Sequence, residues 1–212
     1  GFAPSAQSTP TSTLPARLGD QEFWRLATEA SEPNGFFRSD NLTSNELLFQ
    51  HVVPDLIRRT RPGGVYLGVG PEQNFTYIVA VRPAMAIIFD IRRGNLHAQL
   101  MYKALFELAR DRAEFVSLLF SKPRPAGLGP TSSVTDIFAA FAASPASDAL
   151  YAQTFRAIED RLTKIHKLPL VPQDLECIDY VFSAFHTRGF AIRPTPTYAE
   201  LILSRPRPPC AS

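Results

Sequence analysis

The sequence predicts a helix-rich α/β domain with a parallel sheet flanked by helices. The stretch GGVYLGVGPEQNFTYI, residues 63–78, has the pattern of a strand that enters a glycine loop and then a helix. The stretch PAMAIIFD, residues 83–90, contains a short apolar run bounded by Pro83 and Asp90, typical of a second buried strand. A helical pattern follows it, so the order strand, helix, strand, helix predicts parallel pairing.

Two helices are expected ahead of the first strand. Residues 20–31 place apolar side chains at helical spacing. Residues 43–60 predict a second helix, in which Thr43 and Glu46 have the spacing of a capping box. Pro54 lies inside this stretch and should kink or split the helix, since proline removes a backbone donor.

The chain beyond the second strand is predicted to be helical. One apolar stripe runs from residue 95 to about residue 120 and predicts a single long helix. A Pro/Gly linker, residues 121–130, comes next. Three more helices are expected, with phenylalanines on their buried faces and Gly189 as a C-cap of the last one, at residues 133–143, 147–167 and 174–188.

The predicted sheet is short of strands. A doubly wound sheet needs more than two, and no third strong strand pattern is found. We therefore expect an incomplete domain over residues 20–204, whose remaining strands would come from sequence after Leu203, or a remodelled remnant of a larger domain. A disordered Ser/Thr/Pro-rich arm is predicted at residues 1–19 and a Pro-rich tail at residues 205–212.

Composition removes several classes of function. The formal net charge is +2 with dispersed arginines, which does not predict a nucleic-acid footprint. No apolar run reaches the length of a membrane span. Cys177 and Cys210 lie far apart and outside any C-x-x-C pair, so neither a metal site nor a disulfide is expected. The first residues resemble what remains after signal-peptide removal, so the compartment stays open, and so does the oligomeric state.

The glycine loop carries the functional prediction. Gly68 and Gly70 let the backbone turn sharply and approach a ligand closely, because glycine has no Cβ. Asp90 ends the second strand about 20 residues after Gly70, where a carboxylate accepts hydrogen bonds from ribose hydroxyls in nucleotide-binding βαβ units. This spacing favours an adenosine-type cofactor. The alternative is a structural turn with a helix-capping carboxylate.

Other polar residues near the loop are candidate ligand contacts. Asn74 lies in the first turn of the following helix, with Glu72 and Gln73 as companions. Arg92 and Arg93 follow Asp90, where they bind a carboxylate or phosphate of a ligand or form a solvated helix entrance.

Two further asparagines, Asn41 and Asn45, precede the first strand in SDNLTSNE and are weaker candidates. None of the four histidines has an acid or a nucleophile at a telling spacing, so no catalytic base is assigned.

The residues also resemble a known group of proteins. YLGVGPEQNFTYI, AIIFDIRRGNL and LMYKALFELARDRAEFVSLLF, preceded by SDNLTSNE, are similar to an uncharacterised bacterial family whose fold looks like the class I S-adenosylmethionine-dependent methyltransferases. The resemblance covers about Phe23 to Phe120, with weaker similarity at DYVFSAF and PTYAEL. It implies a Rossmann-like, methyltransferase-like domain that binds S-adenosylmethionine, and members that continue past the end of this chain.

Departures from the methyltransferase pattern leave three hypotheses open. Tyr66 replaces the usual acid of the first motif and Glu72 its last glycine, and no adenine-flanking or catalytic motif is found. The first hypothesis is an S-adenosylmethionine-dependent methyltransferase of unknown acceptor, which holds its cofactor through Gly68, Gly70, Asn74, Asp90 and Arg92. The second is a non-catalytic binding or structural module. The third, a nicotinamide dinucleotide site, ranks lower because Gln73 stands where a glycine or alanine is expected.

Overall fold

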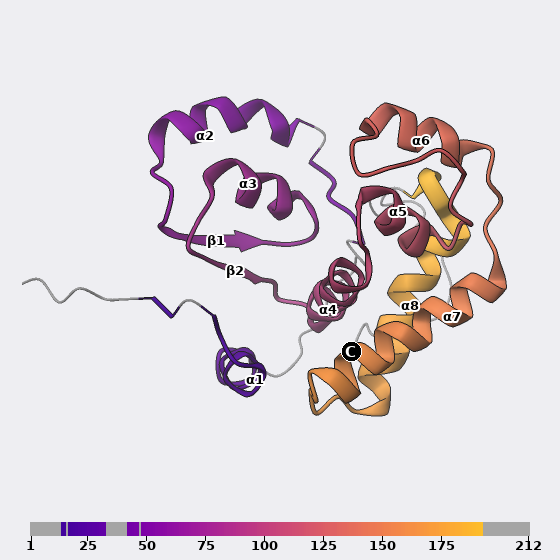
Figure 1. The fold of residues 1–212 in the computed structure, drawn as a ribbon. Helices are drawn as coiled ribbons and strands as arrows, with labels where there is room; N and C mark the ends of the chain where they lie inside the picture. The colour runs from indigo at the N-terminus through magenta and orange to yellow at the C-terminus, as the bar shows by residue number, and fades with distance from the viewer. Residues whose placement is uncertain (1–13, 16, 33–41, 47, 193–212) are drawn as a thin grey trace, which may run out of the picture.

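The computed structural model describes residues 14, 15, 17–32, 42–46 and 48–192. These residues form a helix-rich α/β structure with a small parallel sheet of two strands (Figure 1). The elements in chain order are α1 (Asp20–Glu29), a 3₁₀ turn (Phe49–Val52), α2 (Val53–Arg59), β1 (Val65–Val69), α3 (Gln73–Val81), β2 (Met85–Phe89), α4 (Arg93–Leu108), α5 (Arg112–Phe120), α6 (Val134–Ala142), α7 (Asp148–Asp160), a π turn (Arg161–Ile165), α8 (Pro172–Arg188) and a 3₁₀ turn (Gly189–Ala191).

The two strands confirm the predicted βαβ unit. β1 and β2 pair in parallel, with Val65 opposite Met85 at one end and Val69 opposite Phe89 at the other. α3 connects the strands and covers one face of the sheet, where the Tyr66 hydroxyl donates to Asn74 Oδ1 over 2.7 Å. α2 lies beyond α3 in Figure 1. No third strand is present among the described residues.

The opposite face of the sheet is apolar and open to solvent. Alternate residues of paired strands share a face, so five large side chains gather there, with exposed fractions of 47–65%: Val65, Leu67, Val69, Ile87 and Phe89. We name these five residues the open sheet face. Parallel sheets are usually covered on both faces, so a parallel sheet with one apolar face about half exposed is unusual.

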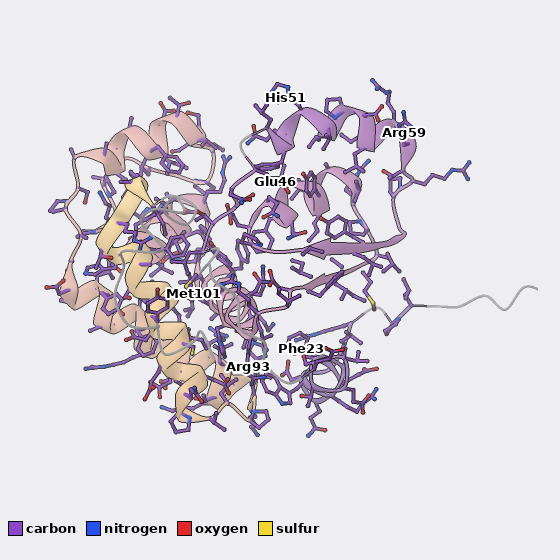
Figure 2. The ribbon with its side chains drawn as sticks, turned by 180° about the vertical axis from the view of Figure 1, so that it is seen from behind. Phe23, Glu46, His51, Arg59, Arg93 and Met101 are labelled. Atoms are coloured by element: carbon purple, nitrogen blue, oxygen red, sulfur yellow. The ribbon has the colours of Figure 1, made fainter. Side chains whose placement is uncertain are left out.

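The core of the molecule lies among the helices. Leu100, Met101, Ala104 and Leu105 of α4 are at most 1% exposed and belong to one cluster with buried side chains of α5, α7 and α8. Figure 2 shows Met101 within this helical part. Phenylalanines were expected in the core, and four of them are buried there: Phe120, Phe141, Phe182 and Phe185. Phe138 differs, being 42% exposed.

The prediction of one helix from residue 95 to about 120 is wrong. The helix α4 ends at Leu108, and a second helix, α5, begins at Arg112 with Asp111 as its N-cap. The Asp111 carboxylate accepts the Glu114 amide over 2.8 Å, which satisfies one of the free donors of the new helix. The apolar stripe continues across the break, so periodicity alone did not reveal it.

The predicted capping box at Thr43 and Glu46 is also wrong. Residues 42–46 are not helical, and the first regular turn begins at Phe49. Ser44 donates its amide to Glu72 instead, 28 residues away. The expected effect of Pro54 is confirmed, because a 3₁₀ turn precedes α2 and the proline lies in the first turn of that helix, where no backbone donor is needed.

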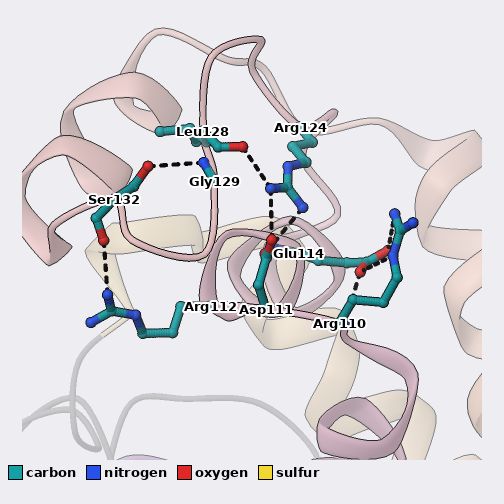
Figure 3. Close-up of polar contacts among 8 residues, drawn as sticks. All are labelled: Arg110, Asp111, Arg112, Glu114, Arg124, Leu128, Gly129 and Ser132. Atoms are coloured by element: carbon teal, nitrogen blue, oxygen red, sulfur yellow. Dashed lines mark hydrogen bonds and ion pairs between the residues drawn. The ribbon is translucent and has the colours of Figure 1, made fainter.

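The Pro/Gly linker after α5 is fixed to that helix by polar contacts (Figure 3). Arg124 donates to both carboxylate oxygens of Asp111, over 3.0 and 2.8 Å, and to the Leu128 carbonyl over 2.7 Å. Arg112 donates to the Ser132 carbonyl over 2.8 Å. The linker therefore turns back across the start of α5 before α6 begins.

The last three predicted helices are confirmed as α6, α7 with its π turn, and α8, and Gly189 caps α8 with a φ of +52°. Cys177 in α8 is disulfide-bonded, so the expectation of no disulfide is wrong. The other cysteine, Cys210, lies outside the described residues, as do the predicted tail at 205–212 and most of the predicted arm.

Candidate functional site

The carboxyl ends of β1 and β2 bring Gly70 and Asp90 together. Gly70 adopts a φ of +86°, in the left-handed region that favours glycine, and its amide donates to the Phe89 carbonyl over 3.1 Å. A Cβ placed on Gly70 would lie 4.0 Å from Asp90 Oδ2. The carboxylate predicted to bind a ribose thus faces the turn predicted to approach the ligand.

Asp90 also fixes the start of α4. Its Oδ1 accepts the backbone amide of Arg92 over 3.0 Å, and Arg92 Nε lies 3.8 Å from the same oxygen. Both side chains are largely buried, at 9% exposure for Asp90 and 11% for Arg92. One carboxylate oxygen therefore serves the helix entrance, as in the capping alternative, while the other faces Gly70.

Asn74 holds the glycine turn from inside. We call residues 68–72 the glycine turn. The Asn74 amide nitrogen donates to the carbonyls of Val69, Gly70 and Pro71 over 3.0, 3.1 and 2.8 Å, and its oxygen accepts from Tyr66. The residue is 1% exposed. Its polar atoms are engaged within the turn, so its expected ligand contact is not supported by this geometry.

Gly68 makes room for this network. A Cβ at Gly68 would lie 2.0 Å from Asn74 Oδ1 and 2.6 Å from the Tyr66 ring, closer than atoms can approach. The missing side chain of Gly68 therefore admits protein atoms, and we assign the residue a structural part in the turn. Gly70, in contrast, has as its nearest neighbour Gln73 Nε2, at 3.4 Å from the Cβ position.

Glu72 links the glycine turn to residues 42–46. Its two carboxylate oxygens accept the Ser44 amide over 3.0 and 3.1 Å. Burial raises the pKa of Glu72, an effect that these backbone hydrogen bonds only partly offset. The sequence marked Glu72 as a candidate for a ligand contact, but its partner Ser44, 28 residues away, could not be read from local spacing.

Arg93 belongs to a separate polar cluster between α4 and α8. Its guanidinium donates to Asp174 Oδ1 over 3.0 and 3.1 Å, and His97 Nε2 lies 2.8 Å from the same oxygen (Figure 2 shows Arg93). Burial lowers the pKa of His97. Burial raises the pKa of Asp174, but hydrogen bonds from His97, the Val171 amide and Arg93 outweigh it and lower the pKa overall.

A second histidine connects two helices. His166 Nδ1 lies 2.9 Å from an Asp20 oxygen of α1, and His166 Nε2 lies 2.7 Å from a Glu107 oxygen of α4. The ring is nearly buried. Both histidine contacts join residues more than 50 positions apart, which is why sequence spacing gave no sign of them.

Asn45, one of the weaker candidates, directly follows Ser44, whose amide contacts Glu72 of the glycine turn. A shallow depression is lined by Asn45, Glu46, Leu48 and Phe49, and the Phe49 ring meets Tyr77 edge-on at 5.8 Å. Gly70 and Asp90 do not line it. Asn41 lies outside the described residues.

Some features are not found in the part of the chain that the structure describes. No group of three or more His, Cys, Asp or Glu side chains there is placed to hold a metal ion. No helix of that part is long and apolar enough to cross a membrane.

Comparison with known proteins gives one match. A family model described as "Domain of unknown function (DUF7790)" matches residues 41–167, more than half of the chain, including the glycine turn, Asp90 and the helices α2 to α7. No curated protein and no solved structure matches the chain.

Proposed function

The chain belongs to the family of the domain of unknown function DUF7790, and we propose that it binds S-adenosylmethionine at the glycine turn. The observation that carries this proposal is the meeting of Gly70, with its left-handed backbone, and the Asp90 carboxylate at the ends of two parallel strands. In open α/β sheets, ligands bind outside the carboxyl ends of the strands. We propose a Rossmann-like arrangement of this sheet on the same grounds.

The charges beside the turn favour a cationic cofactor. Asp90 Oδ2 lies 4.0 Å from the Cβ position of Gly70, and Glu72 is part of the glycine turn, two residues after Gly70. S-adenosylmethionine carries a positive sulfonium and an ammonium group, whereas a dinucleotide carries a doubly charged pyrophosphate. Repulsion between this pyrophosphate and the carboxylates ranks the nicotinamide dinucleotide alternative lower.

Each residue of the turn would have a distinct part. Asp90 would accept the ribose hydroxyls, and Gly70 would let the backbone approach the cofactor. Arg92 would keep Asp90 in place through its amide, while Gly68 and Asn74 would hold the shape of the turn. The cofactor supplies an electrophilic methyl group, and the protein's contribution to its transfer would be the positioning of an acceptor. The methyl acceptor is left unassigned.

A non-catalytic binding or structural module is the second candidate. Asn74 and Tyr66 occupy the space next to Gly68, and Glu72 is engaged with Ser44, so the turn is stabilised without a ligand. A remnant that keeps the fold alone would have these features too.

Calorimetric titration separates the two candidates. Purified protein is titrated with S-adenosylmethionine, S-adenosylhomocysteine and NAD, and its folding is checked by circular dichroism. Saturable binding of the first two and none of NAD supports the proposal. A folded chain that binds none of the three supports the remnant, and a preference for NAD supports the dinucleotide alternative.

A further inference from the structure

Several buried polar atoms have no hydrogen-bond partner among the described residues. Two of them are Gln73 Oε1, in the first turn of the helix after the glycine turn, and Asn95 Oδ1, in the first turn of the helix after Asp90. Gln73 is 9% exposed and Asn95 3% exposed. Buried polar groups are paired in the great majority of cases, so each exception calls for a physical reason.

Gln73 approaches the turn from α3. Its Nε2 donates to the Val69 carbonyl over 3.2 Å and lies 3.4 Å from the Cβ position of Gly70. This bond uses the amide nitrogen and leaves the oxygen as an acceptor. The side-chain amide therefore lies across the turn, next to the glycine that faces Asp90.

Asn95 lies in the first turn of α4, the helix that follows Asp90. It lies four residues before Gln99, on the same face of the helix, and Gln99 Nε2 reaches the Gly70 carbonyl over 3.4 Å. The backbone amide of Asn95 donates to the Arg92 carbonyl at the start of α4, close in sequence to Asp90. The two unpaired oxygens thus lie in the first turns of the two helices that follow the glycine turn and Asp90.

The unpaired side-chain atoms of Gln73 and Asn95 are both acceptors. Gln73 Oε1 and Asn95 Oδ1 can only accept hydrogen bonds. The carboxylates of Asp90 and Glu72, when ionised, are acceptors too. An acceptor left unpaired in the interior destabilises the folded state, and a ligand donor would remove that penalty. The complementary ligand is one that presents N–H and O–H groups.

We infer that Gln73 and Asn95 are ligand-binding residues whose side-chain oxygens accept from amino or hydroxyl groups of a nucleoside-type cofactor. This inference rests on the proposed function, because it concerns the same turn. It extends that function by naming two contacts outside the glycine motif and by specifying their polarity. Neither residue needs to take part in chemistry.

The test replaces the Asn95 carboxamide by an apolar side chain that has the same branching and the same number of heavy atoms. Asn95→Leu removes the unpaired acceptor, so we expect the ligand-free protein to resist denaturant better than wild type and the affinity for S-adenosylhomocysteine to fall about tenfold or more. Thr154→Val is the matched control, because Thr154 Oγ1 in α7 is likewise buried without a partner among the described residues. We expect this control to be more stable and to bind as wild type does.

The outcomes distinguish this inference from the proposed function. If wild type binds S-adenosylhomocysteine and Asn95→Leu binds it equally well, the inference is overturned and the proposed function stands. If wild type binds NAD instead and Asn95→Leu weakens that binding, the inference stands and the proposed cofactor is wrong. If wild type binds neither ligand nor adenosine, both are overturned.

Discussion

At the scale of single residues, Asp90 joins structure and proposed function. Its Oδ1 holds the entrance of α4 through the Arg92 amide, and its Oδ2 faces Gly70. The sequence placed Asp90 correctly at the end of a parallel strand, because apolar strand and acidic terminus are both local signals. The sequence could not show that one oxygen of this carboxylate accepts the Arg92 amide while the other faces Gly70.

Replacement of Asp90 tests the proposed ribose contact. Asp90→Ala is expected to weaken binding of S-adenosylhomocysteine by roughly 1.5–3 kcal/mol, the size of lost hydrogen bonds to a charged group. Calorimetry measures the change, with the exposed Asp160→Ala as the control. Equal affinity in wild type and Asp90→Ala would remove Asp90 from the site.

His97 makes a prediction about pH. Its folded-state pKa lies below the usual 6.5 because the ring is buried, so the unfolded chain binds more protons as the pH falls through this value. The free energy of unfolding should therefore decrease below about pH 6.5, with a further loss below the usual pKa of Asp174, 3.8. Urea unfolding between pH 5 and pH 3 measures the second decrease, and urea unfolding between pH 7 and pH 5 measures the decrease due to His97.

His97→Gln serves as the test variant for this pH dependence. It keeps a side-chain donor for Asp174 but does not titrate, so its stability should vary less with pH over the same interval. His51→Gln is the matched control, because His51 is exposed in the 3₁₀ turn. An unchanged slope in His97→Gln would mean that another group causes the loss.

At the scale of elements, the glycine turn is held together by contacts that local sequence only partly predicts. The two strands and the turn between β1 and α3 were predicted, since apolar runs and glycines are local patterns. The hydrogen bond from the Ser44 amide to Glu72 and the one from His97 to Asp174 join residues 28 and 77 positions apart, so only the fold reveals them. The break at Asp111 was missed because the apolar stripe continues across it.

Gly68 provides the prediction for this element. Gly68→Ala places a methyl group against the Asn74 amide and the Tyr66 ring, so we expect it to destabilise the fold by about 1–3 kcal/mol. Gly129→Ala is the control, because its Cβ position has no neighbour within 4 Å, and it should change stability by less than about 0.5 kcal/mol. Denaturant unfolding compares the two variants, and equal stabilities would contradict the packing described for the turn.

At the scale of the whole molecule, the helical part is well packed while the sheet is open on one face. The buried core runs through α4, α5, α7 and α8, whereas the five apolar residues of the open sheet face are about half exposed. The sequence predicted two strands, and the structure has these two strands in its described part. The further strands of a larger sheet were expected only because a doubly wound sheet needs more than two. Apolar strand sequences predict burial, but only the fold shows which face is covered.

Leu67 tests the open sheet face. Since its side chain is 65% exposed, Leu67→Lys should change the free energy of unfolding by less than about 0.5 kcal/mol and lower the binding of a hydrophobic dye such as anilinonaphthalene sulfonate. Val79→Lys is the control on the outer side of α3, where an isolated valine is 76% exposed. Strong destabilisation by Leu67→Lys, with unchanged dye binding, would mean that this face is covered.

The proposed cofactor site is tested most directly by nuclear magnetic resonance of the ¹⁵N-labelled chain during titration with S-adenosylhomocysteine. We predict that amide signals of Gly70, Gln73 and residues 90–95 shift in a saturable manner, while those of α6 stay in place. Saturable shifts confined to another surface, such as the depression at Asn45 and Phe49, would contradict the site. An unchanged spectrum at saturating ligand would contradict the cofactor.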